Sequence, residues 1–297
     1  MLNNEPKKVL KKYGSSFFWA SQFLGKKLSN QIARLYKFCR YVDNLADSQD
    51  PDRKVILQEI KNHLTDINKD NQPIVIREFM SLAAECSISK EAAEELMMGM
   101  LSDQGKVEIL DESELLRYCH AAAGTVGIMS KQILQCKSHE SIYFAVDLGI
   151  AMQLTNIARD VLEDAQNQRR YIPFTWLKME PNEIARVDKK DLTEVSKAIE
   201  RLIELSEDYY KSALIGIHHI PWRSRIAIVI ALRLYRQIGV QLVKNGTKWW
   251  DGRTIVSNSN KLMLSIFSLS DIILRDVTPH NKNLHSNLSG LTGVNEL

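Results

Sequence analysis

Apolar residues recur along most of the chain at steps of three and four, which is the period of the α-helix. Strand-like alternation is almost absent, and only seven prolines and thirteen glycines interrupt the pattern. Helix starts are recognisable at Asp50, which precedes a proline, and at Asp111 and Asp191, which each have a glutamate three residues later. The pattern predicts an all-α protein of nine or ten helices.

The predicted helices span residues 29–48, 51–66, 74–84, 89–103, 111–136, 139–166, 189–216, 223–245 and 258–275. Residues 166–190 contain two prolines and are predicted as a loop, and residues 245–252 connect the last two long helices. From residue 276 the helical period is lost and Asn, Ser, Gly and His predominate. We therefore expect one helical domain over residues 1–275 and a disordered C-terminal tail over residues 276–297.

Composition is that of an ordinary globular protein with a sizeable core, because 44% of the 297 residues are hydrophobic and 25% are charged. The net charge is +3 without a block of like charge, so no nucleic-acid partner is indicated. Residues 226–232 form the longest aliphatic run, far short of the ~20 residues of a membrane span. We expect a cytoplasmic monomer or homodimer, with at most peripheral contact with the inner membrane face.

The cysteines are too widely spaced for a metal site and are predicted to be buried, reduced thiols. They are Cys39, Cys86, Cys119 and Cys136.

One predicted helix has a polar face where a core stripe would be apolar. Tyr36, Arg40, Asp43 and Asp47 follow one another at steps of four, three and four residues, so their side chains share one side of the helix. A single pair of aspartates at this spacing is more often a solvated helix face than a site.

A second helix repeats the construction. Gln153, Asn156, Asp160 and Asp164 lie along one line, while Leu154 belongs to the apolar packing face. Ionised carboxylates one turn apart repel each other, so an inward-facing pair favours a bound cation.

Two such faces together favour a metal site that binds a diphosphate. Mg²⁺ fits, because it prefers carboxylate oxygens and is commonly completed by substrate phosphate, with Mn²⁺ as an alternative. Arg40 and the amides of Gln153 and Asn156 provide the charge and hydrogen bonds that a diphosphate needs. Two facing acidic helices in a bundle would place the metal ions at the mouth of an apolar cavity.

The sequence resembles the squalene/phytoene synthase family over about residues 13–272. The first aspartate motif runs from Tyr36 to Asp47, and residues 117–127 (RYCHAAAGTVG) resemble a helix that lines the family's pocket. Residues 153–164 (QLTNIARDVLED), followed by 169–173 (RRYIP), match the second motif and its flap. Asn44 stands where many relatives carry a second acid, so the number of metal ions at the first motif stays open.

This resemblance implies an isoprenoid-synthase helical bundle with a central apolar cavity, and a role for each matching residue. Metal ligands would be Asp43, Asp47, Asn156, Asp160, Glu163 and Asp164. Diphosphate contacts would come from Ser16, Arg40, Gln153, Asn156, Arg159, Arg169 and Tyr171. Catalytic roles fall to the four aspartates with Tyr36 and Tyr235, and Tyr235-Arg236 and Arg253 match the family more loosely.

The implied pocket residues are Phe17, Phe18, Tyr118, Gly124, Val126, Gly149 and Leu154. Each also has a simpler interpretation, since glycines allow close helix packing and large apolar residues ordinarily fill a core. His218-His219 is an adjacent pair, and we do not expect it to bind metal.

The implied reaction joins two allylic prenyl diphosphates head to head (1'–1) through a cyclopropyl diphosphate, with C20 substrates favoured over C15 and phytoene as product. Synthases that form squalene, presqualene diphosphate or diapophytoene from farnesyl diphosphate are the alternatives, and NADPH is not expected. Head-to-tail prenyltransferases and terpene cyclases build their second motif differently. A non-catalytic relative used in assembly or lipid binding is the remaining alternative, and the presence of all four aspartates and Arg40 argues against it.

Overall fold

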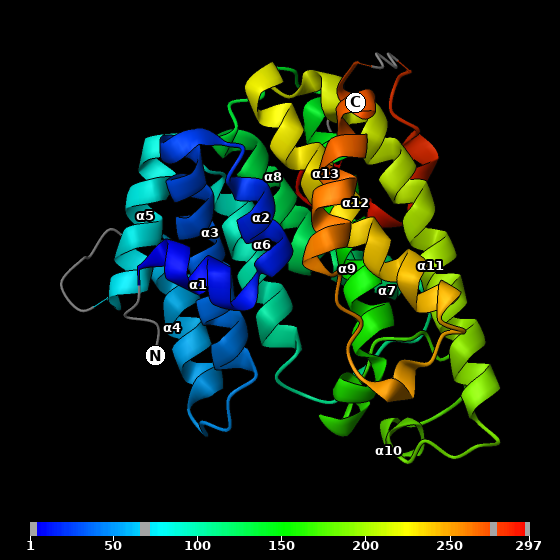
Figure 1. Ribbon diagram of the computed structural model, residues 1–297. Coiled ribbons are helices and arrows are strands. Elements are labelled where there is room, and N and C mark those ends of the chain that lie inside the picture. Colours follow the sequence, from blue (N-terminus) through cyan, green and yellow to red (C-terminus); the bar gives the residue numbers. More distant parts are fainter. Residues whose placement is uncertain (1–4, 66–71, 274–277, 295–297) are drawn as a thin grey trace.

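Thirteen α-helices make up most of the chain in a computed structural model that describes residues 5–65, 72–273 and 278–294 (Figure 1). They are α1 Pro6–Tyr13, α2 Ser15–Ser21, α3 Gly25–Ala46, α4 Arg53–Thr65, α5 Ile74–Cys86, α6 Lys90–Ser102, α7 Glu112–Cys119, α8 Thr125–Ile133, α9 Ser141–Gln166, α10 Pro181–Ala185, α11 Leu192–Ile215, α12 Trp222–Lys244 and α13 Asn258–Ile273. A π-helical turn, η1 His120–Gly124, joins α7 to α8. Short 3₁₀ segments are η2 Gly216–His219, η3 Trp249–Asp251 and η4 Lys282–Leu288.

The predicted all-α class is confirmed, and each predicted helix has a counterpart with similar bounds. Three short helices, α1, α2 and α10, were not predicted. Asp111 caps α7 as expected, since its side chain accepts a 3.0 Å hydrogen bond from the backbone N–H of Glu114. Asp191 makes no such side-chain bond at the start of α11, so that capping prediction was wrong.

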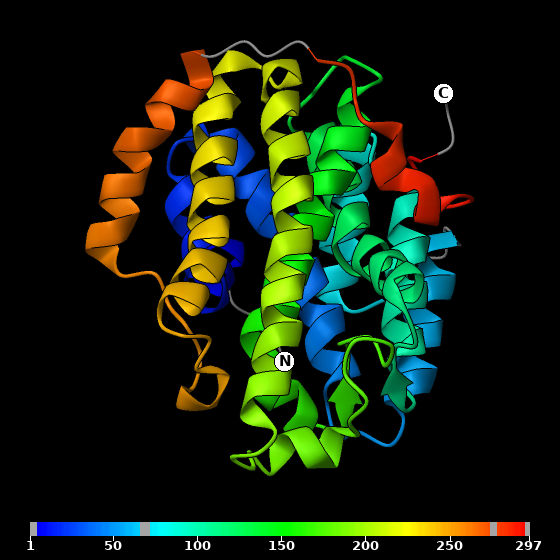
Figure 2. The same cartoon turned by 90° about the vertical axis from the view of Figure 1, so that its right-hand side faces the viewer.

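Helix α9 runs through the centre of the bundle, packed against α8, α11 and α12 (Figures 1 and 2). Helices α9 and α12 are each long and apolar enough to cross a membrane. The sequence did not indicate this, because its longest uninterrupted aliphatic run is short. However, 72% of the apolar window of α9 is buried inside the bundle, so its apolar residues serve the core.

The crossing of α9 with η1 and α8 depends on two glycines. A Cβ atom on Gly149 would lie 2.2 Å from the backbone oxygen of Ala123, and one on Gly127 would lie 2.1 Å from that of Ala145. Any larger side chain at either position would therefore push the two helices apart.

A two-stranded parallel ladder connects the segment after the C-terminal end of α9 to the loop after α6. Strand β1, Val107–Glu108, pairs with strand β2, Arg169–Arg170, so that Val107 lies opposite Arg169. Strand β2 falls within the predicted loop of residues 166–190, and its pairing with β1 holds Arg169 beside the end of α6.

The predicted disordered tail was wrong for residues 278–294, which pack against the bundle (Figure 2). Leu288 is fully buried, and the Tyr209 hydroxyl donates a 2.8 Å hydrogen bond to the carbonyl of Leu284. Arg117 donates to the carbonyls of Asn287 and Ser289 at 3.2 and 3.1 Å. These contacts come from residues distant in sequence, which a search for local periodicity does not detect. The rest of the predicted tail lies outside the described residues.

All four cysteines are free thiols. Cys119 and Cys136 are buried and Cys39 and Cys86 are partly buried, which agrees with the expectation of reduced thiols.

Candidate active site

A cavity of about 690 Å³ runs into the bundle between α2, α3, α8, α9 and α12. That volume lies within the roughly 300–1,000 Å³ typical of small-molecule sites. One face of α9 lines it from Ser141 to Asp164, a length of about 35 Å at 1.5 Å per residue. Along this face the character changes from apolar, at Phe144 and Leu148, to polar, at Asn156 and Asp160. The cavity therefore has an apolar interior and a charged end.

Helix α3 contributes the first acidic motif to the charged end. Arg40 donates a 2.5 Å hydrogen bond to Asp43, and burial raises the pKa of Asp43 to about 6 despite this neighbouring guanidinium. Asp47 is one turn further on and about half exposed. All three residues line the cavity, as the sequence predicts.

Helix α9 contributes the second motif. Arg159 binds Asp160 through two hydrogen bonds of 2.8 and 2.5 Å, and Arg253 reaches the same carboxylate at 3.0 Å from the segment before α13. Burial, followed by repulsion from Asp160, raises the pKa of Asp164 well above its ordinary value. Gln153 and Glu163 complete the predicted set along the same cavity wall, with Glu163 exposed at its mouth.

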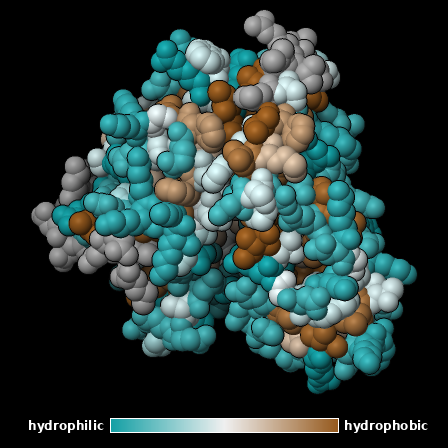
Figure 3. Space-filling view, in the orientation of Figure 1, coloured by the Kyte–Doolittle hydropathy of each residue, from teal (hydrophilic) through white to brown (hydrophobic). Residues whose placement is uncertain are grey.

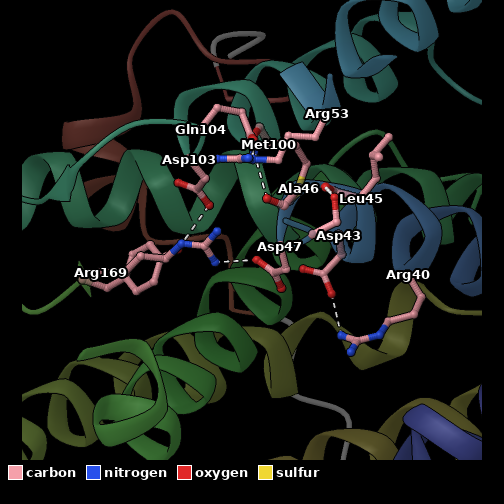
Figure 4. Close-up of polar contacts among 12 residues, drawn as sticks. Arg40, Asp43, Leu45, Ala46, Asp47, Arg53, Met100, Asp103, Gln104 and Arg169 are labelled. Carbon is pink, nitrogen blue, oxygen red and sulfur yellow. Dashed lines mark hydrogen bonds and ion pairs between the residues drawn. The ribbon is translucent and has the colours of Figure 1, made fainter. Parts of the chain in front are cut away.

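Arg169 joins the two motifs. It follows α9 in the sequence and forms an ion pair with Asp47 on α3, and its guanidinium also lies beside Asp103 at the end of α6 (Figure 4). The hydroxyls of Tyr118 and Tyr171 donate to Asp103 at 3.1 and 3.2 Å. The charges of Arg169 and Asp47 also act on the pKa of Asp164 in the second motif, and both acidic rows line the same cavity, so the two rows lie close together at its charged end.

Asp103, which was not predicted from the sequence, lines the cavity and is 9% exposed. Burial raises its pKa to about 6, against the lowering effect of the tyrosine hydroxyls and Arg169. In the sequence, Asp103 is a single acid at the end of a largely apolar helix. Solvated residues are common at such positions, so the sequence gives no specific indication that Asp103 belongs to the site.

The charged end has the features of a divalent-cation site. Within the described part of the chain, the buried Oδ1 of Asn156 has no hydrogen-bond partner, although it lines the cavity. Asp164 also receives no hydrogen bond or ion pair from the described residues, and burial followed by repulsion from Asp160 disfavours its ionised form. Oxygen atoms left without partners beside crowded carboxylates suit a hard cation such as Mg²⁺.

Aromatic rings line the cavity next to the charged end. The Phe17 ring lies 4.8 Å from that of Tyr235 and 6.1 Å from that of Tyr36, centroid to centroid. Burial raises the pKa of both Tyr36 and Tyr235, so these phenols stay neutral at physiological pH. Tyr118 and Tyr171 stack at 4.7 Å on the other side.

The structure divides the predicted pocket residues into two groups. Phe17, Tyr118, Val126 and Gly149 line the cavity, and so does Ser16, which was predicted as a diphosphate contact.

Phe18, Gly124 and Leu154 do not line it, and their assignment to the pocket was wrong. Leu154 is fully buried in the core, because one residue along α9 rotates a side chain by about 100° from Gln153. Gly124 packs against His120 and Val146, and Phe18 lies under the ammonium group of Lys11.

Comparison with known proteins agrees with this geometry. The profile of the squalene/phytoene synthase family matches residues 10–260. The chain is 32% identical to 15-cis-phytoene synthase of Enterobacter agglomerans over 277 residues, covering 89% of this chain and 94% of the relative. It is 30% identical to 15-cis-phytoene synthase of Pantoea ananas over 281 residues, covering 89% and 90%.

Solved structures give the same result. A dehydrosqualene synthase in complex with a ligand superposes with a TM-score of 0.80 at 26% identity, covering 89% of this chain and 94% of that one. Squalene synthase HpnC from Alicyclobacillus acidocaldarius, at 20% identity and a TM-score of 0.71, covers 82% and 93% and supports the shared fold. Sequence profile, relatives and fold agree: the chain is a prenyltransferase that belongs to the squalene/phytoene synthase family.

Proposed function

We propose that this enzyme condenses two molecules of geranylgeranyl diphosphate head to head, through a cyclopropyl diphosphate, to phytoene. The observation that carries the proposal is the placement of both acidic rows at one end of a single, otherwise apolar cavity. The similarity to relatives named 15-cis-phytoene synthase supports the C20 substrate and this product.

Divalent metal ions are a general requirement of this prenyltransferase family, and we propose Mg²⁺ as the ion here. Asp43, Asp47, Asp160 and Asp164 would hold it, with Asn156 and Glu163 as further oxygen ligands. When bound, such an ion neutralises a diphosphate and makes it a better leaving group.

The basic residues around the acids would orient the diphosphates. Arg40, Arg159, Arg169 and Arg253 line the cavity, and each is paired with one of its aspartates. A diphosphate could take over these guanidinium groups as bidentate partners, which releases the carboxylates. Gln153, Ser16 and the Tyr171 hydroxyl add hydrogen-bond donors nearby.

The interior would protect and position the prenyl chains. Rings of Phe17, Tyr36 and Tyr235 lie where the apolar wall meets the charged end, and aromatic faces stabilise nearby cations by up to about 2 kcal/mol when water is excluded. Removing water also prevents premature capture of an allylic cation.

Product analysis tests the proposal directly. Purified protein is incubated with Mg²⁺ and either geranylgeranyl or farnesyl diphosphate, with and without NADPH, and hydrocarbon products are identified by mass spectrometry. We expect phytoene from the C20 substrate, in equal amounts with and without NADPH. Product from farnesyl diphosphate alone would move the enzyme to the C15 alternatives, and no diphosphate release from either substrate would reject the proposal.

We also propose peripheral contact with a membrane surface, where such hydrophobic substrates and products reside. The outer face of α13 exposes Leu262, Met263, Ile266 and Phe267 at 48–66%, and apolar colour gathers over this helix in Figure 3. Co-sedimentation with phospholipid vesicles should fall when Ile266 and Phe267 are replaced by serine. Equal sedimentation of this variant and the wild type would refute the contact.

Cytoplasmic location and a monomeric or homodimeric state remain predictions from the sequence. Cell fractionation tests the first, and size-exclusion chromatography with light scattering tests the second.

A further inference from the structure

A buried cluster of one carboxylate and two imidazoles lies away from the acidic motifs. Asp147 on α9 is held between two histidines of the C-terminal segment: its Oδ2 is 2.9 Å from Nε2 of His280, and its Oδ1 is 2.7 Å from Nε2 of His285. One ligand atom from each of the three residues lies within 4.8 Å of the others. The group joins positions more than 130 residues apart in the sequence.

Burial of the cluster is nearly complete. The side chains of Asp147, His280 and His285 are 0%, 2% and 6% exposed. A fully buried carboxylate must be compensated by positive charge or by several hydrogen bonds. Against the effect of burial, hydrogen bonds from the two imidazoles lower the pKa of Asp147, so this carboxylate is ionised and can serve as a metal ligand. A divalent cation would replace those hydrogen bonds as its positive partner.

Surrounding groups hold Asp147 and the backbone that carries the two histidines. The Ser212 hydroxyl on α11 donates a 2.5 Å hydrogen bond to Oδ2 of Asp147. Glu140 accepts a 3.1 Å hydrogen bond from the backbone N–H of His280, and the Tyr209 hydroxyl holds the carbonyl of Leu284. Outer hydrogen bonds of this kind fix the direction of the ligands in metal sites.

We propose that Asp147, His280 and His285 form a structural zinc site that fastens residues 278–294 to the bundle. Two imidazoles and one carboxylate suit a borderline transition ion and disfavour Mg²⁺ or Ca²⁺, which prefer oxygen ligands throughout. The cluster belongs to a closed environment, since none of the three residues lines the cavity. Burial away from the cavity favours a structural role, and a water molecule would complete the four-coordinate geometry that zinc prefers.

Phe144 connects this site with the cavity. Its side chain lines the apolar end of the cavity, while its ring meets that of His280 edge to face at 5.2 Å. The zinc site therefore lies behind the wall of the cavity, at the end remote from the acidic motifs.

The test uses untagged, full-length protein treated with chelator and then dialysed against Zn²⁺. The background variant Asp43→Asn/Asp160→Asn removes two acids of the active site, so that zinc bound there does not obscure the count. We expect one zinc per chain in this background, measured by mass spectrometry of the metal, and a higher melting temperature with zinc than without it. His285→Ala and His280→Gln should lose the bound zinc and the shift, whereas His63→Ala on α4 should keep both.

Two further measurements keep the test independent of folding. Co²⁺ in place of Zn²⁺ should give visible absorption bands of a site with nitrogen ligands in the unaltered cluster, and Zn²⁺ should abolish them. Ser212→Ala should weaken zinc binding roughly 10- to 100-fold, the usual effect of removing an outer hydrogen bond. Zinc content below 0.1 per chain in the background variant, or equal content and equal melting shifts in His285→Ala, would overturn the proposal.

Discussion

Replacing Asp103 by asparagine should stabilise the folded enzyme at neutral pH while it impairs turnover. Burial raises the pKa of this carboxyl from its ordinary 3.8 to about 6, so ionising it in the folded state is unfavourable. Asparagine has nearly the same shape, and its oxygen can still accept from Tyr118 or Tyr171. The substitution therefore removes the buried charge and keeps most of the packing.

The expected magnitude follows from proton linkage. A carboxyl whose pKa is raised on folding favours the folded state only at low pH, and its unfavourable contribution grows as the pH rises from the unfolded toward the folded pKa. With values of 3.8 and about 6, the loss is about 0.5 kcal/mol at pH 4, about 1.5 at pH 5 and about 3 at pH 7.5. The advantage of Asp103→Asn over the wild type should grow by the same amounts, less any hydrogen-bond energy that the amide loses.

Urea unfolding at several pH values from 4.5 to 7.5, followed by circular dichroism, measures this difference. The matched control is Asp188→Asn, an exposed aspartate in the loop before α11, which should show no growing advantage. Turnover of geranylgeranyl diphosphate should fall about tenfold in Asp103→Asn, because Arg169 loses a charged neighbour worth about 1.5 kcal/mol. A stability difference that is independent of pH, or a variant less stable than the wild type at pH 7.5, would refute the reasoning.

Three more predictions concern the helix crossing, the first motif and the second motif. Gly149→Ala should lower the free energy of unfolding by about 1–3 kcal/mol, because its Cβ would clash with the Ala123 backbone. The control Gly105→Ala, whose Cβ would point into open space, should not show this loss, and urea unfolding of both variants makes the comparison. Lowering the pH from 7 to 5 should raise the Mn²⁺ concentration needed for half-saturation about tenfold, because Asp43, whose pKa is about 6, must be ionised to bind metal. Electron paramagnetic resonance without substrate measures the Mn²⁺ affinity, and an affinity that does not change with pH would contradict the prediction. Arg253→Gln should raise the KM for geranylgeranyl diphosphate about tenfold, equivalent to about 1.4 kcal/mol, and steady-state kinetics showing an unaltered KM would exclude its contact with the diphosphate.

Local spacing was sufficient to predict the two acidic rows. Asp43 and Asp47, like Asp160 and Asp164, are separated by one helical turn, so the sequence alone places each pair on one side of its helix. That the two rows share one cavity depends on how α3 packs near α9, which the sequence indicated only through the repetition of the motif and the family resemblance.

The predictions from the sequence were wrong or incomplete where the place of a side chain depends on a shift of one helical position or on a contact with residues distant in the sequence. Leu154 and Phe18 each follow a residue that lines the cavity, and one step along a helix turns the side chain by about 100°. Asp103 and the C-terminal segment obtain their partners from tertiary contacts, such as those of His280 and His285 with Asp147. Neither helical period nor composition carries that information.

We propose that the two acidic rows act together, through divalent ions, to remove diphosphate from a prenyl chain. The most direct measurement is the rate of diphosphate release from geranylgeranyl diphosphate with Mg²⁺ by the wild type, Asp43→Asn and Asp160→Asn, with the helical content of each checked by circular dichroism. We predict rapid release by the wild type and a loss of at least roughly a thousandfold, about 4 kcal/mol, in each variant at unchanged helical content. Release at the wild-type rate by either variant, or by the wild type without any divalent ion, would show that the two acidic rows do not act together through metal ions.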